Sequence, residues 1–311
     1  MRDPFAPFVA RRGAVLLDGG HATELERLGV DLSDPLWSAR ALLDAPDSIL
    51  RVHRDYLEAG ADVIASATYQ ATVSGLEARG LPRGRAEAVL RSGVDLARRA
   101  RDAHAETGDG GDGRPRPLVA ASIGSYGAFL ANGAEYRGGY GLSVEALAAW
   151  HRPRVRLLEG SGADVLAFET VPSATEAEAI VRVLGETDGP PAWISFSARS
   201  ASAISEGTPL EEAIAIAEAA PRVLAVGFNC VSPELVLPLL ARARPRTGKR
   251  LVVYPNRGDT WDPVSRGWIV RGVPVDFEAL APVWRDAGAT LIGGCCRTTP
   301  ADVRAMASGL G

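Results

Sequence analysis

The feature that most constrains the fold is a regular alternation of short apolar runs with amphipathic segments along all 311 residues. Buried parallel strands read as continuous apolar runs, whereas helices repeat their apolar residues with a 3.6-residue period. The sequence predicts strands at Ala14–Leu17, Val63–Ser66, Leu118–Ser122, Val165–Phe168, Ala192–Ser197, Val223–Gly227, Leu251–Tyr254 and Thr290–Ile292. It predicts helices at Ser48–Ala59, Ala86–His104, Val144–Glu159, Thr175–Leu184, Leu210–Ala219, Pro233–Ala243 and Phe277–Asp286, with Ala301–Ser308 as a further one.

Strict alternation of strand and helix implies a parallel sheet, and this number of units implies closure into a (β/α)8 TIM-type barrel of the α/β class. A recurring pattern of helix end, glycine turn and buried strand supports the repeat, at Ala59–Ser66, Gly160–Phe168 and Asp286–Gly294. We therefore predict a single barrel domain over residues 1–311. The alternative is an open doubly wound sheet, which favours a GxGxxG turn after the first strand, and LLDGGHATELE lacks that turn.

Composition and charge exclude several classes of protein. An apolar share of 46% and a charged share of 23% are those of a folded globular chain, and a net charge of -4 leaves no basic footprint for nucleic acid. No apolar run approaches the roughly 18 residues of a membrane span, and the arginine-interrupted start does not read as a signal peptide. We expect a cytoplasmic monomer or small homo-oligomer whose partners are small molecules, with no nucleic acid and no membrane.

The cysteines are the chemically most informative residues. Cys230 follows the sixth predicted strand, and Cys295 and Cys296 follow the eighth. In a closed barrel both positions lie at the C-terminal rim, so the three sulfurs are expected to converge there. An odd, sparse set of thiols in a reducing compartment argues against a disulfide framework, although single buried cysteines also serve as small core residues.

Three converging thiolates favour a zinc site with an open fourth position, which marks a catalytic rather than a structural centre. A metal of this kind holds a substrate thiol as the thiolate, so the site indicates alkyl transfer onto sulfur. We expect Gly227, Gly293 and Gly294 to let the chain turn the sulfurs toward one ion. His21, near the end of the first strand, is a weaker candidate for a fourth ligand.

Two carboxylates extend this site. Asp18 ends the first predicted strand and Glu169 ends the fourth. Carboxylates at the C-terminal ends of barrel strands usually serve the substrate, here by charge-assisted hydrogen bonds to an α-amino group. The alternative is that each caps the turn or helix that follows it.

Five sequence motifs together resemble those of a known family. DGGHATELERLG, SATYQAT, AFETVPS, VGFNC and LIGGCCRTTPADV occur in the order of the homocysteine S-methyltransferases, and the resemblance runs from about Leu16 to Met306. The sequence is most similar to the zinc-dependent bacterial branch that uses S-methylmethionine or S-adenosylmethionine. The resemblance implies one zinc held by Cys230, Cys295 and Cys296, with homocysteine as the fourth ligand.

The resemblance also implies a reaction and a set of substrate contacts. The activity would be transfer of a methyl group from a sulfonium donor to zinc-bound homocysteine thiolate, giving methionine. Asp18 and Glu169 would bind the homocysteine amino group, and Tyr69 would lie near the donor. The full set of expected substrate-binding residues is Asp18, Gly19, Tyr69, Glu169, Thr170 and Asn229.

Arg257 departs from the family pattern, because YPNRG places a cation where relatives carry a small residue. A cation beside a sulfonium is unfavourable unless it points away or pairs with a carboxylate. Three alternatives stay open. The same site could use betaine as donor or another thiol or selenol as acceptor; LIGG could bind a phosphorylated metabolite; or the barrel could store zinc or sense thiols without catalysis.

Overall fold

The computed structural model describes residues 3–32, 38–106, 114–262, 267–270 and 275–311. Its core is an 8-stranded parallel sheet in the order β1-β12-β9-β8-β5-β4-β3-β2. A parallel bridge between Leu17 and Val63 joins the first and last strands of this order, and the Asp62 amide donates to the Leu16 carbonyl at 2.7 Å. The predicted (β/α)8 barrel is confirmed. The strands are β1 (Val15–Leu16), β2 (Val63–Ala65), β3 (Leu118–Gly124), β4 (Val165–Val171), β5 (Ala192–Phe196), β8 (Val223–Asn229), β9 (Arg250–Tyr254) and β12 (Ala289–Ile292).

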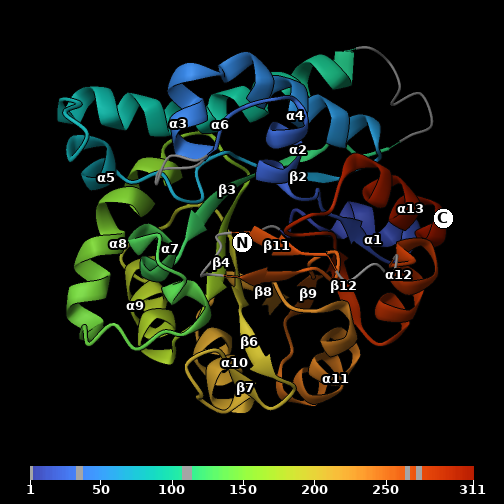
Figure 1. The fold of residues 1–311 in the computed structure, drawn as a ribbon. Coiled ribbons are helices and arrows are strands. Elements are labelled where there is room, and N and C mark those ends of the chain that lie inside the picture. Colours follow the sequence, from blue (N-terminus) through green and yellow to red (C-terminus); the bar gives the residue numbers. More distant parts are fainter. Residues whose placement is uncertain (1–2, 33–37, 107–113, 263–266, 271–274) are drawn as a thin grey trace.

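Helices surround these strands on all sides (Figure 1). Every helix that the sequence predicted is present, because each has an apolar face long enough to show the helical period. They are α4 (Pro46–Glu58), α6 (Arg83–Glu106), α8 (Val144–Glu159), α9 (Ala174–Leu184), α10 (Leu210–Glu218), α11 (Pro233–Ala243), α12 (Phe277–Asp286) and α13 (Pro300–Leu310). No helix in the described ranges is apolar over a stretch long enough to cross a membrane.

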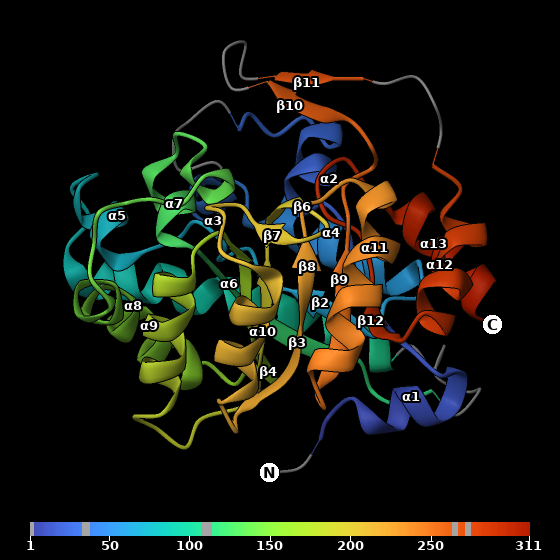
Figure 2. The ribbon, with the colours of Figure 1, turned by 90° about the horizontal axis from the view of Figure 1, so that it is seen from below.

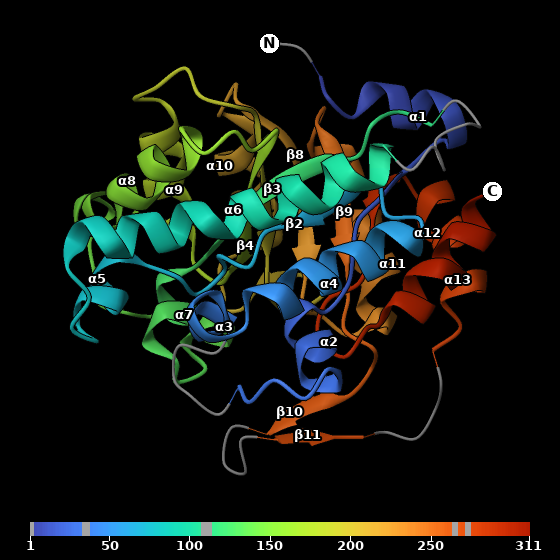
Figure 3. The ribbon, with the colours of Figure 1, turned by 90° about the horizontal axis from the view of Figure 1, so that it is seen from above.

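The structure adds short elements that the sequence analysis did not predict, since they are too brief to show a period. In Figures 2 and 3, α7 and the β10–β11 hairpin lie at one end of the barrel, and α1 lies at the other. The added elements are α1 (Ala6–Arg12), α2 (His21–Arg27), α3 (Ser38–Asp44), α5 (Val73–Glu77), α7 (Tyr126–Leu130), η1 (Ala134–Tyr136), η2 (Arg244–Arg246), β6 (Ala198–Ser200), β7 (Ala203–Ile204), β10 (Thr260–Asp262) and β11 (Gly267–Ile269).

The barrel interior is a separate apolar core. Successive strand residues face opposite sides of the sheet, so Val165 and Ala167 of β4 point inward while Leu166 packs against the helices. Phe5 and Phe8, from α1 and the residue before it, pack into this interior core, and the Phe5 ring lies 6.4 Å from that of Trp193. The end of the barrel at which the strands begin is therefore filled with apolar side chains.

Toward the C-terminal ends of the strands, the inward-facing side chains become polar. Glu169 follows Val165 and Ala167 on the inward face of β4, and Ser122 of β3 donates to its Oε1 at 2.5 Å. Ser195 of β5 donates to Asn229 Oδ1 of β8 at 2.8 Å. The barrel thus changes from an apolar interior to a hydrogen-bonded polar layer beneath the loops that follow the strands.

A glycine-to-alanine pair tests this packing. In Gly227→Ala the new Cβ would lie 1.8 Å from the Val252 carbonyl oxygen of β9, so the strands must separate. We expect the free energy of unfolding to fall by about 3 kcal/mol, the upper end of usual overpacking costs. Gly84→Ala, where a Cβ meets nothing within 4 Å, is the matched control and should be neutral or slightly stabilising. Equal urea midpoints for Gly227→Ala and the wild type would contradict the close β8–β9 contact.

Candidate metal and substrate site

The three cysteine sulfurs meet at the C-terminal mouth of the barrel. Their Sγ atoms all lie within 4.8 Å of one another, and Cys230 Sγ is 3.7 Å from Cys296 Sγ. Zinc–sulfur bonds of about 2.3 Å in a tetrahedral sphere require sulfurs about 3.8 Å apart, so this spacing fits a zinc ion. Among the described residues, no other group of three or more His, Cys, Asp or Glu side chains is placed to hold a metal.

The turn that brings the sulfurs together does not come from the glycines. Cys230 itself has a φ of 52°, and Arg297, just after the cysteine pair, has a φ of 69°, whereas Gly227, Gly293 and Gly294 are not among the left-handed residues. A non-glycine residue in this region is strained and is held there by its surroundings. Our expectation that these glycines turn the chain was wrong.

Those glycines are required by close approach instead. A Cβ on Gly293 would lie 2.6 Å from the Leu17 Cβ, and one on Gly294 would lie 2.3 Å from Thr298 Oγ1. Both positions sit where the loop after β12 passes next to the end of β1. The same holds for Gly19, where a Cβ would lie 2.9 Å from Thr298 Oγ1. The small residues therefore let two loops pack against each other beneath the cysteines.

Asn256 ties the two cysteine loops together, and the sequence analysis did not single it out. Its side-chain Oδ1 accepts the Cys296 backbone N–H at 3.1 Å. Its backbone N–H donates to the Val231 carbonyl at 2.9 Å. Two further backbone bonds hold the sulfurs against β9 and its loop, from Cys230 N to Tyr254 O at 3.2 Å and from Cys295 N to Pro255 O at 2.8 Å. The only sign of Asn256 in the sequence was its position two residues after a predicted strand.

The three thiols differ in pKa. The pKa of Cys230 lies well below the usual thiol value, because Cys295 and Cys296 hydrogen-bond to its sulfur. The pKa values of Cys295 and Cys296 are raised for the same reason and by burial. Tyr136 of η1 also hydrogen-bonds to the Cys230 sulfur. The cluster thus concentrates negative charge on Cys230, where a cation is favoured.

His21 does not join this cluster. Its ring packs at a tilt of 42° against that of His53, with centroids 5.1 Å apart, and neither nitrogen of either ring has a hydrogen-bond partner. Burial lowers the pKa of His21 to about 4, so the ring is neutral near pH 7. The weak candidacy of His21 as a fourth ligand is therefore not supported by its position.

The two predicted carboxylates lie close enough to repel one another. Asp18 accepts the Ala65 amide at 2.7 Å; burial and the nearby Glu169 raise its pKa well above the usual value. Burial also raises the pKa of Glu169 to about 7, against hydrogen bonds from Ser122 and Tyr254. Two desolvated carboxylates with few cationic partners favour a positively charged group between them.

Asn229 and Thr170 form a bridge between β8 and β4. The Thr170 N–H donates to Asn229 Oδ1 at 2.8 Å, and Asn229 Nδ2 donates to Thr170 Oγ1 at 2.7 Å. Thr170 has a φ of 56°, which this reciprocal pair helps to hold. Asn229 Nδ2 also lies 3.8 Å from Cys295 Sγ. Both residues thus position the site from below.

Tyr69 reaches the same region from the loop after β2. The pKa of its phenol is raised well above the usual value by burial and then by Glu135 and Cys230. Tyr136 is likewise kept neutral by burial and by the nearby thiols. The structure therefore places two neutral phenols beside the sulfurs. The sequence places Tyr136 in a long loop after the third strand, among the loops expected to build the site, but it assigns no role to Tyr136 or Glu135, because nothing in that loop fixes which side chains face the sulfurs.

Arg257 points away from the sulfurs. Its guanidinium pairs with Asp302 in the first turn of α13 at 3.3 Å, and its backbone N–H donates to the Cys296 carbonyl at 3.1 Å. The cation that departs from the family pattern is therefore paired with a carboxylate.

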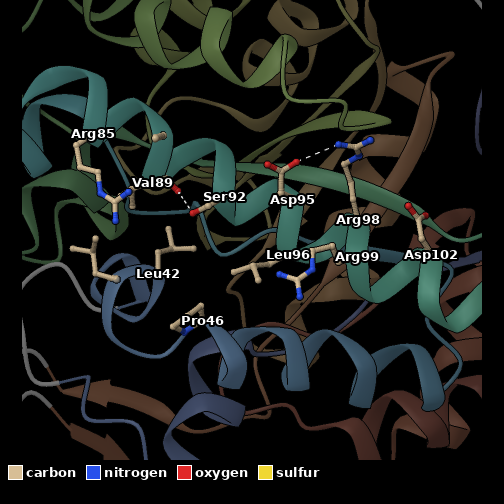
Figure 4. A pocket seen from close by; sticks show the side chains of 12 residues that line it. Leu42, Pro46, Arg85, Val89, Ser92, Asp95, Leu96, Arg98, Arg99 and Asp102 are labelled. Carbon is tan, nitrogen blue, oxygen red and sulfur yellow. Dashed lines mark hydrogen bonds and ion pairs between the residues drawn. The ribbon is translucent and has the colours of Figure 1, made fainter.

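A surface cavity elsewhere does not belong to this site. It has a volume of about 680 Å³ and is lined by residues of α3, α4 and α6 such as Leu42, Pro46 and Arg99. Figure 4 shows these side chains between the helices, outside the strands of the barrel. None of the cysteines or strand-end carboxylates lines it.

The fold and the site together define a (β/α)8 barrel with a cluster of three thiols suited to a metal and two carboxylates suited to a cationic substrate group. The family model described as homocysteine S-methyltransferase matches residues 15–310. The chain belongs to the homocysteine S-methyltransferase family, and it is a methyltransferase.

Similar proteins cover nearly the whole chain. A selenocysteine Se-methyltransferase from Brassica oleracea var. italica is 47% identical over 304 residues, which span 94% of this chain and 88% of the relative. The homocysteine S-methyltransferase of Escherichia coli (strain K12) is 45% identical over 306 residues, spanning 98% and 97%. The metallated crystal structure of the Escherichia coli homocysteine methyltransferase MmuM matches with a TM-score of 0.87 at 43% identity, covering 98% of this chain and 99% of that one.

Replacing one thiol tests the cluster. We expect Cys296→Ser to weaken Zn²⁺ binding by more than the roughly 10- to 100-fold typical of an outer-shell change, because it removes one of three sulfurs. Competition with a chromophoric chelator measures the affinity. Arg257→Ala, next to Asn256 but directed at Asp302, is the control and should keep wild-type affinity. Unaltered Zn²⁺ affinity in Cys296→Ser would show that the cluster is not the metal site.

Proposed function

We propose that this protein transfers a methyl group from a sulfonium donor, S-methylmethionine or S-adenosylmethionine, to the sulfur of homocysteine and so forms methionine. The observation that carries the proposal is the meeting of three cysteine sulfurs within 4.8 Å beside the strand-end carboxylates Asp18 and Glu169. Its partners are small molecules, and its free thiols suit a reducing cytoplasm.

We propose zinc as the metal, held by Cys230, Cys295 and Cys296. The 3.7 Å spacing of two of the sulfurs and the all-thiolate donor set support this choice. When bound, zinc supplies a Lewis acid that keeps the acceptor's sulfur deprotonated and nucleophilic at neutral pH. Asn256 and Asn229 hold the cysteine loops in the arrangement that the ion requires.

The acceptor is oriented by its amino group. Asp18 and Glu169 face the same region, and their mutual repulsion is relieved when an ammonium group lies between them. Charge-assisted hydrogen bonds of this kind fix direction as well as affinity. Glu169 is itself held by Ser122 at 2.5 Å, so the ammonium is bound at a defined distance from the sulfurs.

The chain's remaining task is to align the donor. In the transfer, the acceptor sulfur forms a bond to the methyl carbon while the bond from that carbon to the sulfonium sulfur breaks. The donor leaves as a neutral thioether that keeps the electron pair, and the acceptor's thiol proton has already gone to solvent. Tyr69 and Tyr136 place neutral phenols near the sulfurs, and aromatic rings suit a sulfonium cation.

A selenol is a second candidate acceptor. The relative from Brassica oleracea var. italica, 47% identical over 304 residues, is named for methylation of selenocysteine. A selenol ionises more readily than a thiol, so the same carboxylates and cluster would serve it. Selenohomocysteine and selenocysteine therefore belong in the acceptor panel.

A donor panel tests the activity. Zinc-loaded protein is incubated with homocysteine and, in parallel, S-methylmethionine, S-adenosylmethionine or betaine, and methionine is measured by mass spectrometry. We expect methionine from a sulfonium and none from betaine, because the neutral thioether is a better leaving group than an amine. The absence of methionine from every donor, with zinc bound, would overturn the proposal in favour of zinc storage or thiol sensing.

The acceptor role of Glu169 predicts a pH dependence. Only its ionised form attracts an ammonium group, and burial raises its pKa to about 7. We expect Glu169→Gln to lower kcat/KM for homocysteine roughly 10- to 100-fold above that pH, the loss of a charge-assisted hydrogen bond. Below that pH the difference should shrink, because the wild-type carboxyl is then protonated.

The measurement is the ratio of wild-type to variant kcat/KM from pH 6 to pH 9, which cancels ionisation of the substrate thiol. Glu211→Gln, on the exposed face of α10 and bonded to Arg242 at 2.8 Å, controls for the loss of one negative charge. A ratio near one at every pH would assign Glu169 to a structural role.

A further inference from the structure

One buried carboxylate oxygen at the mouth of the barrel has no hydrogen-bond partner. It is Oε2 of Glu135, in the single turn η1 that follows β3 and α7. Among the described residues, it is the one carboxylate oxygen in the set of buried polar atoms without a partner. An ionised carboxylate that is desolvated and unpaired is costly, so its place requires a reason.

Structural carboxylates in this molecule are satisfied by contrast. Glu176, fully buried at the start of α9, accepts the Tyr126 N–H at 2.5 Å, the Tyr140 hydroxyl at 3.0 Å and pairs with His151 Nε2 at 2.9 Å. Asp62, also buried, accepts the Leu16 N–H at 2.8 Å and pairs with arginine. The unsatisfied Glu135 is therefore unlike the carboxylates that hold the fold together.

The backbone of Glu135 is fixed from two sides. Ser197, just after β5, donates its hydroxyl to the Glu135 carbonyl at 2.8 Å. On the other side, α7 packs so closely that a Cβ on Gly127 would lie 2.4 Å from the Glu135 nitrogen. The backbone that carries this side chain is thus held in place by the fold.

The surroundings of this carboxyl group are those of the proposed donor side. It raises the pKa of the Tyr69 phenol, and it lies within electrostatic reach of Cys230. Burial raises the pKa of Glu135 itself to about 7. The Glu135 backbone N–H and the neighbouring Arg137 act against that rise in pKa. Arg137 is exposed and donates to the Asn132 carbonyl at 3.0 Å, and Oε2 of Glu135 keeps no hydrogen-bond partner. Phenols, thiols and a carboxyl group with one unpartnered oxygen therefore share one region.

We infer that Glu135 is the counter-ion for the positively charged sulfur of the methyl donor. This inference rests on the proposed function and deepens it, because it names the residue that selects a cationic donor. The sulfonium would lie against Oε2 and the faces of Tyr69 and Tyr136. Its charge satisfies the buried oxygen, and the desolvated setting strengthens their attraction.

The chemistry of the reaction gives this pairing a kinetic signature. Positive charge on the donor sulfur disappears as the methyl group leaves, so a carboxylate stabilises the bound donor more than the transition state. Removing it should raise KM for the donor and leave kcat unchanged or higher. The same loss of charge frees the spent thioether from Glu135, which favours its release.

The test compares Glu135→Gln with the wild-type, zinc-loaded enzyme. Calorimetry measures binding of S-methylmethionine and of methionine, whose sulfur is uncharged, and kinetics are measured with homocysteine saturating. We expect Glu135→Gln to weaken S-methylmethionine binding and raise its KM by roughly 10- to 100-fold, with methionine affinity and kcat not reduced. Glu135→Asp, which keeps the charge, should recover part of the loss.

Glu145→Gln, an exposed residue at the start of α8 paired with Arg182, is the control for net charge and should match the wild type. Homocysteine binding is measured in every preparation. If the wild type binds homocysteine and Glu135→Gln keeps the same preference for the sulfonium over the thioether, the assignment of Glu135 alone is overturned. If the wild type binds neither homocysteine nor any sulfonium, the proposed function falls, and this inference falls with it.

Discussion

Closure of the sheet between β1 and β2 is the interaction on which the site depends. The bridge from Leu17 to Val63 completes the ring, and the Asp18 N–H then donates to the Val63 carbonyl at 3.0 Å. Asp18 also accepts the Ala65 amide at the end of β2. The hydrogen bonds that close the sheet between β1 and β2 therefore also fix the position of the Asp18 carboxylate. Only in a closed ring do the ends of β1, β4, β8 and β12 face one common space.

Buried acidic groups surround the mouth of the barrel. The thiols of Cys230, Cys295 and Cys296 lie on one side, and Asp18, Glu169 and Glu135 lie around them. Burial opposes the ionisation of each group, so positive charge nearby would favour their ionised forms. The proposed metal ion, substrate ammonium group and donor sulfonium are three different cations, and we assign each to a different part of this surface.

The sequence was sufficient for whatever depends on local periodicity. The strands, the long helices and the meeting of the cysteines follow from apolar patterns and from the rule that strand ends share a rim. Contacts between distant loops were not accessible in this way. Asn256 joining the cysteine loops, Glu135 held by Ser197, and Arg257 turned toward Asp302 each require the packed structure. The glycines near the cysteines were recognised, but their reason is close packing and not conformational freedom.

The apolar side chains that fill the barrel at the end where the strands begin affect how substrates reach the site. Phe5 and Phe8 pack against Trp193 and its neighbours and fill that end of the interior. In the proposed reaction, substrates would therefore enter and products leave at the opposite end of the barrel, where α7 and the β10–β11 hairpin lie (Figures 2 and 3). In the proposed arrangement, an acceptor held by Glu169 in the polar layer would lie deeper than a donor beside η1. The depth of each subsite would then decide which molecule can exchange while the other stays bound.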